Sequence, residues 1–370
     1  MTERSADSAV LRVFASAAHA GHAPPVIVAR GIEQPALERP ARAEALDAAL
    51  RAAGHMLSEP LDYGLDPIRA VHRGPYLDFL RTVHDRWQAR RAAGWKASET
   101  VQAQGFSLRH LHPVPGELQA QVGHYLGGGW APVDAGTWTA AVSAAHCALA
   151  AADTVIAGAD VAYALCRPPG HHAYADLAGG FCYLNNAAIA AERLAGHFGR
   201  VAILDIDVHH GNGTQGIFYN RGDVDFVSVH VDPTVCYPFY CGYGDERGSG
   251  AGFSHTLNLA LPRGTRDDRF LDAIAEGLAA IGRGDPGVLV LSLGLDAHEA
   301  DPTGEFAVTT QGYRRAGALI AGLNRPTVLV QEGGYGVPVL GEALLAFIDG
   351  FLTRRPSHLG MVRRENALAF

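Results

Sequence analysis

From about residue 160 onward, short apolar runs rich in β-branched residues alternate with amphipathic stretches of helical period. This alternation is typical of a mainly parallel β-sheet with helices on both faces, so the sequence predicts an α/β fold. The expected strands are residues 161–165, 201–206, 226–230, 288–293 and 327–331. The expected helices are residues 185–195, 266–281, 309–321 and 340–352. In such sheets ligands bind beyond the carboxyl ends of the strands, and we expect the functional site there.

The first half of the chain has a weaker pattern. It predicts a strand at residues 10–14 and helices at residues 40–53, 67–90 and 137–152. Residues 92–126 are rich in Gly, Pro and His and lack a clear period, so we expect an inserted loop, either a functional one or a mobile surface excursion. We expect residues 1–370 to form one domain that carries this insertion.

The charge balance argues against nucleic acid as a partner. The chain has 38 acidic and 30 basic residues, a net charge of −8, and no arginine-rich block. This charge disfavours polyanions and mildly favours cationic substrates. Five cysteines without a C-x-x-C pair indicate a reducing compartment, and we expect the cytoplasm. The uncharged run at residues 13–29 is interrupted by His and Pro, so we expect neither an export leader nor a membrane-spanning segment.

Acidic and imidazole side chains follow two of the expected strands. Asp205, Asp207 and His209 alternate at the end of the apolar run 201–206, so their side chains should share one face. Asp296 follows the strand at 288–293. Asp207, His209 and Asp296 would form a three-ligand site with a position left for water, as in catalytic zinc sites, although Fe²⁺ or Co²⁺ would also suit these ligands. The alternative for Asp207 and His209 is a capped turn in which both bond to the backbone.

Two further polar segments follow other expected strands. His171 and His172 come after a Pro-Pro turn and suit general acid and base work near pH 7, or they are a surface pair. Tyr335 lies on a glycine-flanked turn after residues 327–331, where its hydroxyl could donate to an oxyanion or serve only packing. Because all these signals fall at strand ends of one sheet, together they indicate metal-assisted hydrolysis. His298 and Glu299 resemble a fragment of a zincin motif without its second histidine, and we expect both at the surface.

Six segments together resemble the histone deacetylase superfamily, which shares the arginase-like fold. They are RPPGHHA, GGFCYLNNAAIAA, DIDVHHGNGTQGIFY, VSVHVDP, SLGLDAHEADP and EGGYG. Within the superfamily the sequence is most similar to bacterial acetylpolyamine amidohydrolases, through YPFYCGYGDE, EGGYGVP and the insertion containing PGELQAQVGHY. The resemblance implies a three-layer arginase/deacetylase-like fold with its active site at the carboxyl ends of the strands.

The resemblance also implies a role for each candidate residue. Zinc would bind Asp207, His209 and Asp296. His172 would be the general base, with His171 as its electrostatic partner, and Tyr335 would stabilise the oxyanion. Asp205 and Asn212 would orient the two histidines. A structural potassium ion would be bound by Asp205, Ser228 and Val229 and by the backbone of Asp207 and His209. The implied substrate-binding residues are Gly180, Phe181, Tyr237 and Glu117, of which Phe181 and Tyr237 would wall a narrow slot for an aliphatic chain.

The expected function is therefore zinc-dependent removal of acetyl groups from small N-acetylated amines of polyamine metabolism. By the resemblance, the insertion would narrow the entrance through dimerisation, and Glu117 would pair with the distal ammonium of the substrate or, alternatively, be a solvated glutamate at a helix start. The alternative with the same chemistry is a deacetylase acting on acetyl-lysine in proteins or peptides. A metal-dependent sensor without turnover is disfavoured by the presence of His172 and Tyr335, and a serine hydrolase by the absence of a G-x-S-x-G motif.

Overall fold

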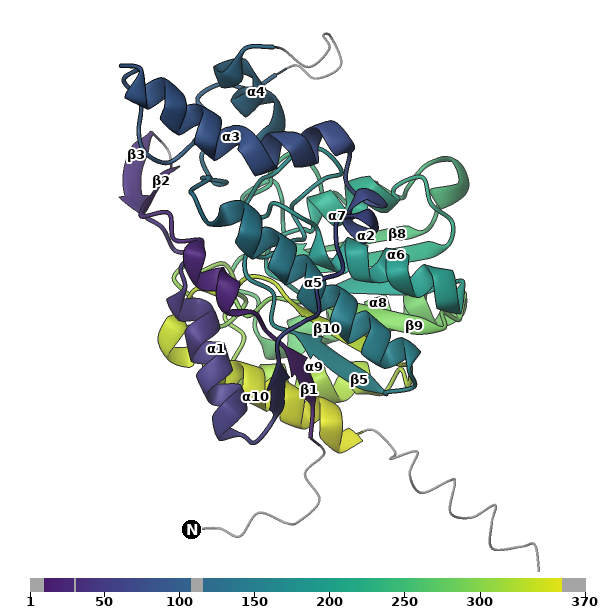
Figure 1. Ribbon diagram of the computed structural model, residues 1–370. Coiled ribbons are helices and arrows are strands. Elements are labelled where there is room, and N and C mark those ends of the chain that lie inside the picture. Colours follow the sequence, from purple (N-terminus) through teal and green to yellow (C-terminus); the bar gives the residue numbers. More distant parts are fainter. Residues whose placement is uncertain (1–9, 30, 108–115, 355–370) are drawn as a thin grey trace, which may run out of the picture.

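The fold is centred on one eight-stranded sheet in which all strands run parallel (Figure 1). The computed structural model describes residues 10–29, 31–107 and 116–354. The strand order is β4-β1-β5-β10-β9-β6-β7-β8. The strands are β1 (Arg12–Phe14), β4 (Met56–Ser58), β5 (Val161–Ala164), β6 (Val201–Asp205), β7 (Val224–Val231), β8 (Thr256–Leu261), β9 (Val288–Leu293) and β10 (Thr327–Gln331). A separate antiparallel pair consists of β2 (Val26–Ala29) and β3 (Ile32–Pro35).

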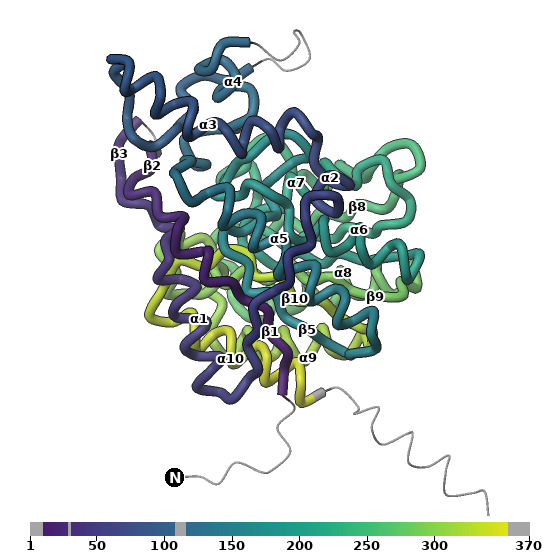
Figure 2. The backbone as a smooth tube through the Cα atoms, in the orientation of Figure 1, coloured from purple at the N-terminus to yellow at the C-terminus, as the bar shows by residue number. Residues whose placement is uncertain are grey.

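Helices cover both faces of the sheet, as the alternating pattern predicts. The helices are α1 (Ala41–Ala52), α2 (Asp66–Arg69), α3 (Gly74–Ala92), α4 (Leu118–Tyr125), α5 (Thr137–Ile156), α6 (Asn186–Phe198), α7 (Asn212–Phe218), α8 (Asp267–Gly284), α9 (Thr310–Ala321) and α10 (Val337–Arg354), with 3₁₀ turns at η1 (Ala17–Gly21) and η2 (Gly250–Gly252). Helices α5 and α6 pack on one face, and α1, α8, α9 and α10 pack on the other. Figure 2 shows α1 and α10 at one end of the molecule and α3 and α4 at the other.

Strand side chains alternate between two separate hydrophobic cores. Val201 and Ile203 of β6 pack with α5 and α6, whereas Ala202 and Leu204 pack with α8, α9 and α10. The same alternation holds in β9 and β10, because both faces of a parallel sheet are buried. The apolar runs of the sequence therefore reflect burial on two sides, and the predicted α/β class is confirmed.

Most expected elements are present, with shifted ends. The strands at 288–293 and 327–331 begin and end as predicted. The expected helix at 67–90 is wrong as one element, because α2 ends at Arg69 and α3 begins only at Gly74. Pro75, in the first turn of α3, has no N–H to continue an earlier helix and disfavours helical geometry in the residue before it.

The expected insertion at 92–126 contains more structure than predicted. Helix α4 lies inside it, and Val101 forms an isolated bridge with Val133. The loop prediction is therefore wrong for residues 118–125, while residues 108–115 lie outside the described residues. Strands β4 and β8, the β2–β3 hairpin and α7 were also missed, because each is short or lies at an edge of the sheet.

One helix in the described part of the chain is long and apolar enough to cross a membrane. It is α5, of which 67% of the most apolar window is buried inside the fold. Its alanine-rich face packs against α6 and the sheet. Helix α5 is therefore packed as a core helix of the molecule.

Candidate metal and catalytic site

Four neighbouring strands carry the predicted site residues at their carboxyl ends. Strands β5, β10, β9 and β6 lie side by side in this order. The chain after them carries, respectively, His171 and His172, then Tyr335, then Asp296, and finally Asp207 and His209. Segments up to 164 residues apart in sequence, from His171 to Tyr335, therefore meet at one edge of the sheet, where the fold class predicts a ligand site.

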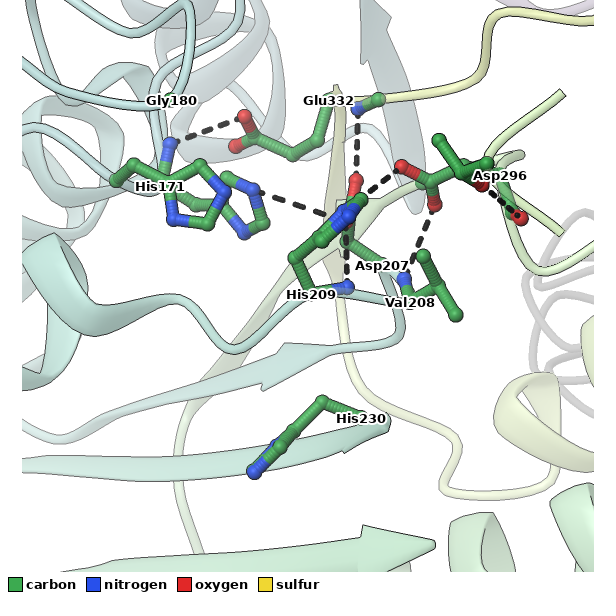
Figure 3. Close-up of polar contacts among 12 residues, drawn as sticks. His171, Gly180, Asp207, Val208, His209, His230, Asp296 and Glu332 are labelled. Atoms are coloured by element: carbon green, nitrogen blue, oxygen red, sulfur yellow. Dashed lines mark hydrogen bonds and ion pairs between the residues drawn. The ribbon is translucent and has the colours of Figure 1, made fainter. Parts of the chain in front are cut away.

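Three of these side chains point towards one another (Figure 3). Ligand atoms of Asp207, His209 and Asp296 all lie within 4.8 Å of one another. The Nδ1 atom of His209 is 3.2 Å from Asp207 Oδ1 and 3.3 Å from Asp296 Oδ2. Apart from this contact with His209, Asp296 Oδ2 is buried without a hydrogen-bond partner among the residues that the structure describes. Two buried carboxylates, one of them with an oxygen that accepts no other hydrogen bond from a described residue, and an imidazole together fit a divalent cation.

Backbone amides hold both carboxylates in place. The N–H of Val208 donates to Asp296 Oδ1 at 3.0 Å, and the N–H of Gly333 donates to Asp207 Oδ2 at 2.8 Å. A Cβ atom at Gly333 would lie only 2.2 Å from Asp296 Oδ2 and 2.5 Å from Asp207 Oδ2. Glycine at position 333 therefore lets the backbone contact both carboxylates directly.

The two carboxylates of this site oppose each other's ionisation. Burial, together with the charge of Asp207, raises the pKa of Asp296 to about 7. Burial also opposes ionisation of Asp207, but the neighbouring imidazoles of His171 and His209 hold its pKa well below the usual range. Adjacent buried carboxylates repel each other, and a bound cation would relieve that repulsion.

The two adjacent histidines have opposite environments. His171 Nδ1 is 2.9 Å from Asp205 Oδ2, and although burial opposes the charged form, Asp207 and Asp205 raise the pKa of His171 to about 10. His172 Nδ1 is 2.6 Å from Asn212 Oδ1. Burial, reinforced by the charges of His171 and His209, lowers the pKa of His172 well below its usual value. His172 is therefore neutral at pH 7, and if Nδ1 donates to Asn212, its Nε2 is free to accept a proton.

Glycine at position 180 lets the backbone pass close to the His172 ring. Its φ is +51°, and a Cβ atom there would lie 2.3 Å from Cδ2 of His172. The following Phe181 is a non-glycine residue at φ 66°, held by a 2.6 Å hydrogen bond from its N–H to the carbonyl of Trp130. Strained backbone of this kind is characteristic of functional sites.

Tyr335 is held by two charged side chains that the sequence analysis missed. Asp301 accepts hydrogen bonds from the backbone N–H of Tyr335 at 2.7 Å and of Gly336 at 2.9 Å. The guanidinium of Arg42 lies 4.8 Å from the centre of the Tyr335 ring and donates to the carbonyl of Glu332 at 2.7 Å. Burial raises the pKa of Tyr335 well above its usual value, so the hydroxyl keeps its proton and can donate it in a hydrogen bond.

Arg42 belongs to a buried ion-pair network. Glu38 accepts from Arg42 at 2.7 Å and from Arg167 at 2.8 and 2.9 Å. A sequence signal for this was available, because Arg42 is four residues before Leu46 and eight before Leu50 on the buried face of α1. A charged residue in an apolar stripe indicates a buried partner.

The site opens into a cavity of about 520 Å³. Predicted residues that line it are His172, Gly180, Phe181, His209, Tyr237 and Tyr335. The remaining lining residues were not predicted and are Gln34, Leu37, Trp130, Val235, Cys236, Phe239, Arg263, Pro302, Thr303 and Glu305. The Tyr237 ring packs edge-on against His172 with centroids 4.9 Å apart. The proposed slot residues Phe181 and Tyr237 thus both reach the cavity.

Glu117 lies elsewhere. It is not among the described residues that line the cavity. Its side chain caps α4 by accepting from the N–H of Ala120, and it pairs with Arg90.

The residues of the implied potassium site lie on two neighbouring strands. Asp205 and Ser228 are paired across β6 and β7, and Val229 is the next residue of β7.

Two predictions made from the sequence are wrong. Strand β6 ends at Asp205, so Asp207 and His209 lie in the turn beyond it and strand alternation does not orient them. His298 is only 4% exposed rather than on the surface, because its ring stacks on Tyr313 and its Nε2 is 3.1 Å from the hydroxyl of Thr310. Glu299 is exposed as expected.

Comparison with known proteins agrees with this geometry. The histone deacetylase domain family matches residues 36–351. An acetylpolyamine amidohydrolase from Burkholderia pseudomallei is 47% identical over 89% of this chain and 95% of its own length, and one from Mycoplana ramosa is 42% identical over 85% and 92%.

Solved structures give the same result. A crystal structure of acetylpolyamine aminohydrolase from Burkholderia pseudomallei has a TM-score of 0.90 and 44% identity, covering 94% of this chain and all of its own. An HDA15 HD domain has a TM-score of 0.77 and 27% identity, covering 96% of this chain and 93% of its own. The family match spans most of the chain, and the chain therefore belongs to the histone deacetylase family.

Proposed function

We propose that this protein is a zinc-dependent deacetylase that hydrolyses small N-acetylated amines, the acetylpolyamines. The observation that carries the proposal is the convergence of Asp207, His209 and Asp296 beside a neutral His172 and a protonated Tyr335 at one cavity. The family match and the relatives named acetylpolyamine amidohydrolase support both the reaction and the substrate class.

The donor set fits the divalent metal that the family implies. Asp207, His209 and Asp296 would hold it, with Zn²⁺ as the proposed ion and Fe²⁺ or Co²⁺ as alternatives. Such an ion polarises the amide carbonyl and lowers the pKa of water. We further propose a structural K⁺ at Asp205, Ser228, Val229 and the backbone of Asp207 and His209.

The protein side chains would move the proton and stabilise charge. His172 accepts a proton from the attacking water at Nε2 and returns it to the leaving amine nitrogen. Asn212 fixes the His172 ring by accepting from Nδ1–H, and the cationic His171, held by Asp205, adds positive charge beside the reaction. The Tyr335 hydroxyl donates a hydrogen bond to the carbonyl oxygen as negative charge develops.

The size of the cavity suits a slender substrate. A cavity of about 520 Å³ with aromatic walls at Phe181 and Tyr237 accommodates an acetyl group and an aliphatic chain.

We propose that the chain folds as one domain, acts as a cytoplasmic homodimer through the insertion at 92–126, and binds neither nucleic acid nor membranes. Glu117, on this insertion, remains a predicted contact of the distal ammonium.

A substrate panel tests the proposal. The zinc-loaded protein should release acetate from acetylputrescine, acetylcadaverine or acetylspermidine with a kcat/KM well above that for acetyl-lysine peptides. The reverse order would make the protein a peptide deacetylase of the same chemistry, and no turnover of either class would refute the proposed function. Sedimentation of the purified protein tests the dimer.

A further inference from the structure

We propose that Glu305 selects, from within the cavity, substrates that carry a free ammonium group at the end opposite the acetyl group, a role separate from the contact proposed for Glu117. This inference rests on the proposed function, because it assumes that the cavity receives an acetylated amine. It concerns a carboxylate that neither the metal site nor the proton transfer uses.

Glu305 is distinguished by its place in the cavity. Of the described residues that line the cavity, Glu305 is the one that carries a carboxylate. Its side chain is only 12% exposed, so its charge acts where little water screens it. A largely buried negative charge in a cavity that receives an aliphatic amide would stabilise a cationic group at the far end of that amide.

The carboxylate is held in one orientation by Arg263. Its Oε2 accepts from Arg263 Nε at 2.6 Å, and its Oε1 accepts from Arg263 Nη2 at 3.1 Å. Arg263 Nη2 also donates to the carbonyl of Val235, another lining residue, at 2.8 Å. This bidentate pair uses one lone pair of each oxygen, and the second lone pair of each oxygen can accept from an ammonium.

The segment that carries Glu305 is anchored to the catalytic residues. Glu305 follows Asp296 by nine residues, and between them Asp301 accepts the backbone N–H groups of Tyr335 and Gly336. The N–H of Gly264 donates to the carbonyl of Glu305 at 2.8 Å. The carboxylate is therefore fixed relative to the acetyl end of the site, as a residue that measures substrate length and charge must be.

The position of Arg263 limits what the site accepts. Its side chain is 53% exposed and that of Glu305 only 12%, so water screens the positive charge of Arg263 more than the negative charge of Glu305. One ammonium that reaches Glu305 gains a hydrogen-bonded charge partner, whereas a neutral chain end leaves the carboxylate with Arg263 alone. The pair therefore favours a cationic end without leaving an unpaired buried charge when the cavity is empty.

The test compares acetylputrescine with N-pentylacetamide, which replaces the ammonium by a methyl group of similar size. In Glu305→Gln, KM for acetylputrescine should rise about 10-fold with little change in kcat, while kcat/KM for N-pentylacetamide stays within about twofold. Higher ionic strength should raise the acetylputrescine KM of the wild-type protein and have less effect on the variant. Unchanged turnover of the neutral substrate shows that the variant is folded.

The matched control is Glu299→Gln, an exposed glutamate of the same segment. It should leave both substrates unaffected. Equal changes for both substrates in Glu305→Gln, no change for either, or the same selective loss in Glu299→Gln would overturn the inference. A wild-type protein that does not hydrolyse acetylputrescine would instead refute the proposed function.

Discussion

At the scale of single residues, the Tyr335 side of the site depends on a buried network of paired charges. Glu38 is 1% exposed and lies between Arg42 and Arg167. Burial opposes its ionisation, yet the two guanidinium groups lower the pKa of Glu38 below its usual value. Removing one partner of such a buried network leaves an uncompensated charge, which costs more than the pair contributes.

Arg42→Met tests this network. We expect the free energy of unfolding to fall by about 3 to 5 kcal/mol, because Glu38 loses a partner and the carbonyl of Glu332 loses a donor. Chemical denaturation measures the change. The control is Arg51→Met on the same helix, whose ion pair with Asp47 is 61% exposed on the arginine side, so its loss should change the free energy of unfolding far less. Equal losses in the two variants would contradict the account.

Tyr335→Phe tests the oxyanion role. Only the hydroxyl is removed, so we expect kcat to fall by about 10²- to 10³-fold while KM and the melting temperature change little. Steady-state kinetics on acetylputrescine and thermal unfolding measure both. A kcat within a few-fold of the wild-type value would show that Tyr335 only packs against Phe181 and Arg42.

At the scale of elements, the start of α6 joins the core to the histidine-bearing loop. Asn185 caps α6 by accepting from the N–H of Ala188, and its own N–H donates to Nε2 of His72 at 2.9 Å. The Asn185 amide also donates to the carbonyl of Ala173, next to His172. Burial lowers the pKa of His72 to about 4. A proton at Nε2 would remove the acceptor of the Asn185 N–H.

A pH-dependent loss of stability follows. The unfolded chain binds a proton at His72 near pH 6.5 and the folded chain only near pH 4, so stability falls as pH drops through this window. The contribution is on the order of 3 kcal/mol. Denaturation at several pH values should show a shallower slope for His72→Gln than for the wild-type protein. An unchanged slope would contradict the assignment, and His197→Gln at an exposed position of α6 controls for loss of a histidine.

The elements could be predicted where burial imposes a clear pattern. Strands β9 and β10 are buried on both faces, and their apolar runs end where the strands end. Strand β8 lies at the edge of the sheet, and its sequence is less apolar because it includes Thr256 and Asn258. Helix α4 was hidden because its eight residues include Gly and two Gln within a stretch rich in loop-forming residues.

At the scale of the whole molecule, sheet topology creates the site from separated segments. Each of the four neighbouring strand ends could be read as a weak signal, and their adjacency follows from the α/β class. The residues that hold the site side chains in place could not be predicted this way. Arg42, Asp301 and Glu332 act through backbone groups of distant segments, and sequence spacing does not reveal which carbonyl or N–H a buried charge will meet.

Removal of the metal should destabilise the whole fold. Asp205, Asp207, Asp296 and Glu332 are fully buried close together, and a bound cation compensates part of their charge. Zinc at about a thousand times its Kd adds roughly 4 kcal/mol, which should raise the melting temperature by several degrees over the chelated protein. Asp207→Asn should lose most of this zinc-dependent shift. An equal shift in this variant would place the ion elsewhere.

The most direct test of the central claim is a titration of the metal-free protein with Zn²⁺ while acetate release from acetylputrescine is measured. The account predicts no turnover without metal, a rise that saturates at one ion per active site, and no recovery in Asp296→Asn at the same zinc concentration. Turnover by the fully chelated protein, or full activity of Asp296→Asn, would contradict a metal centre built from Asp207, His209 and Asp296.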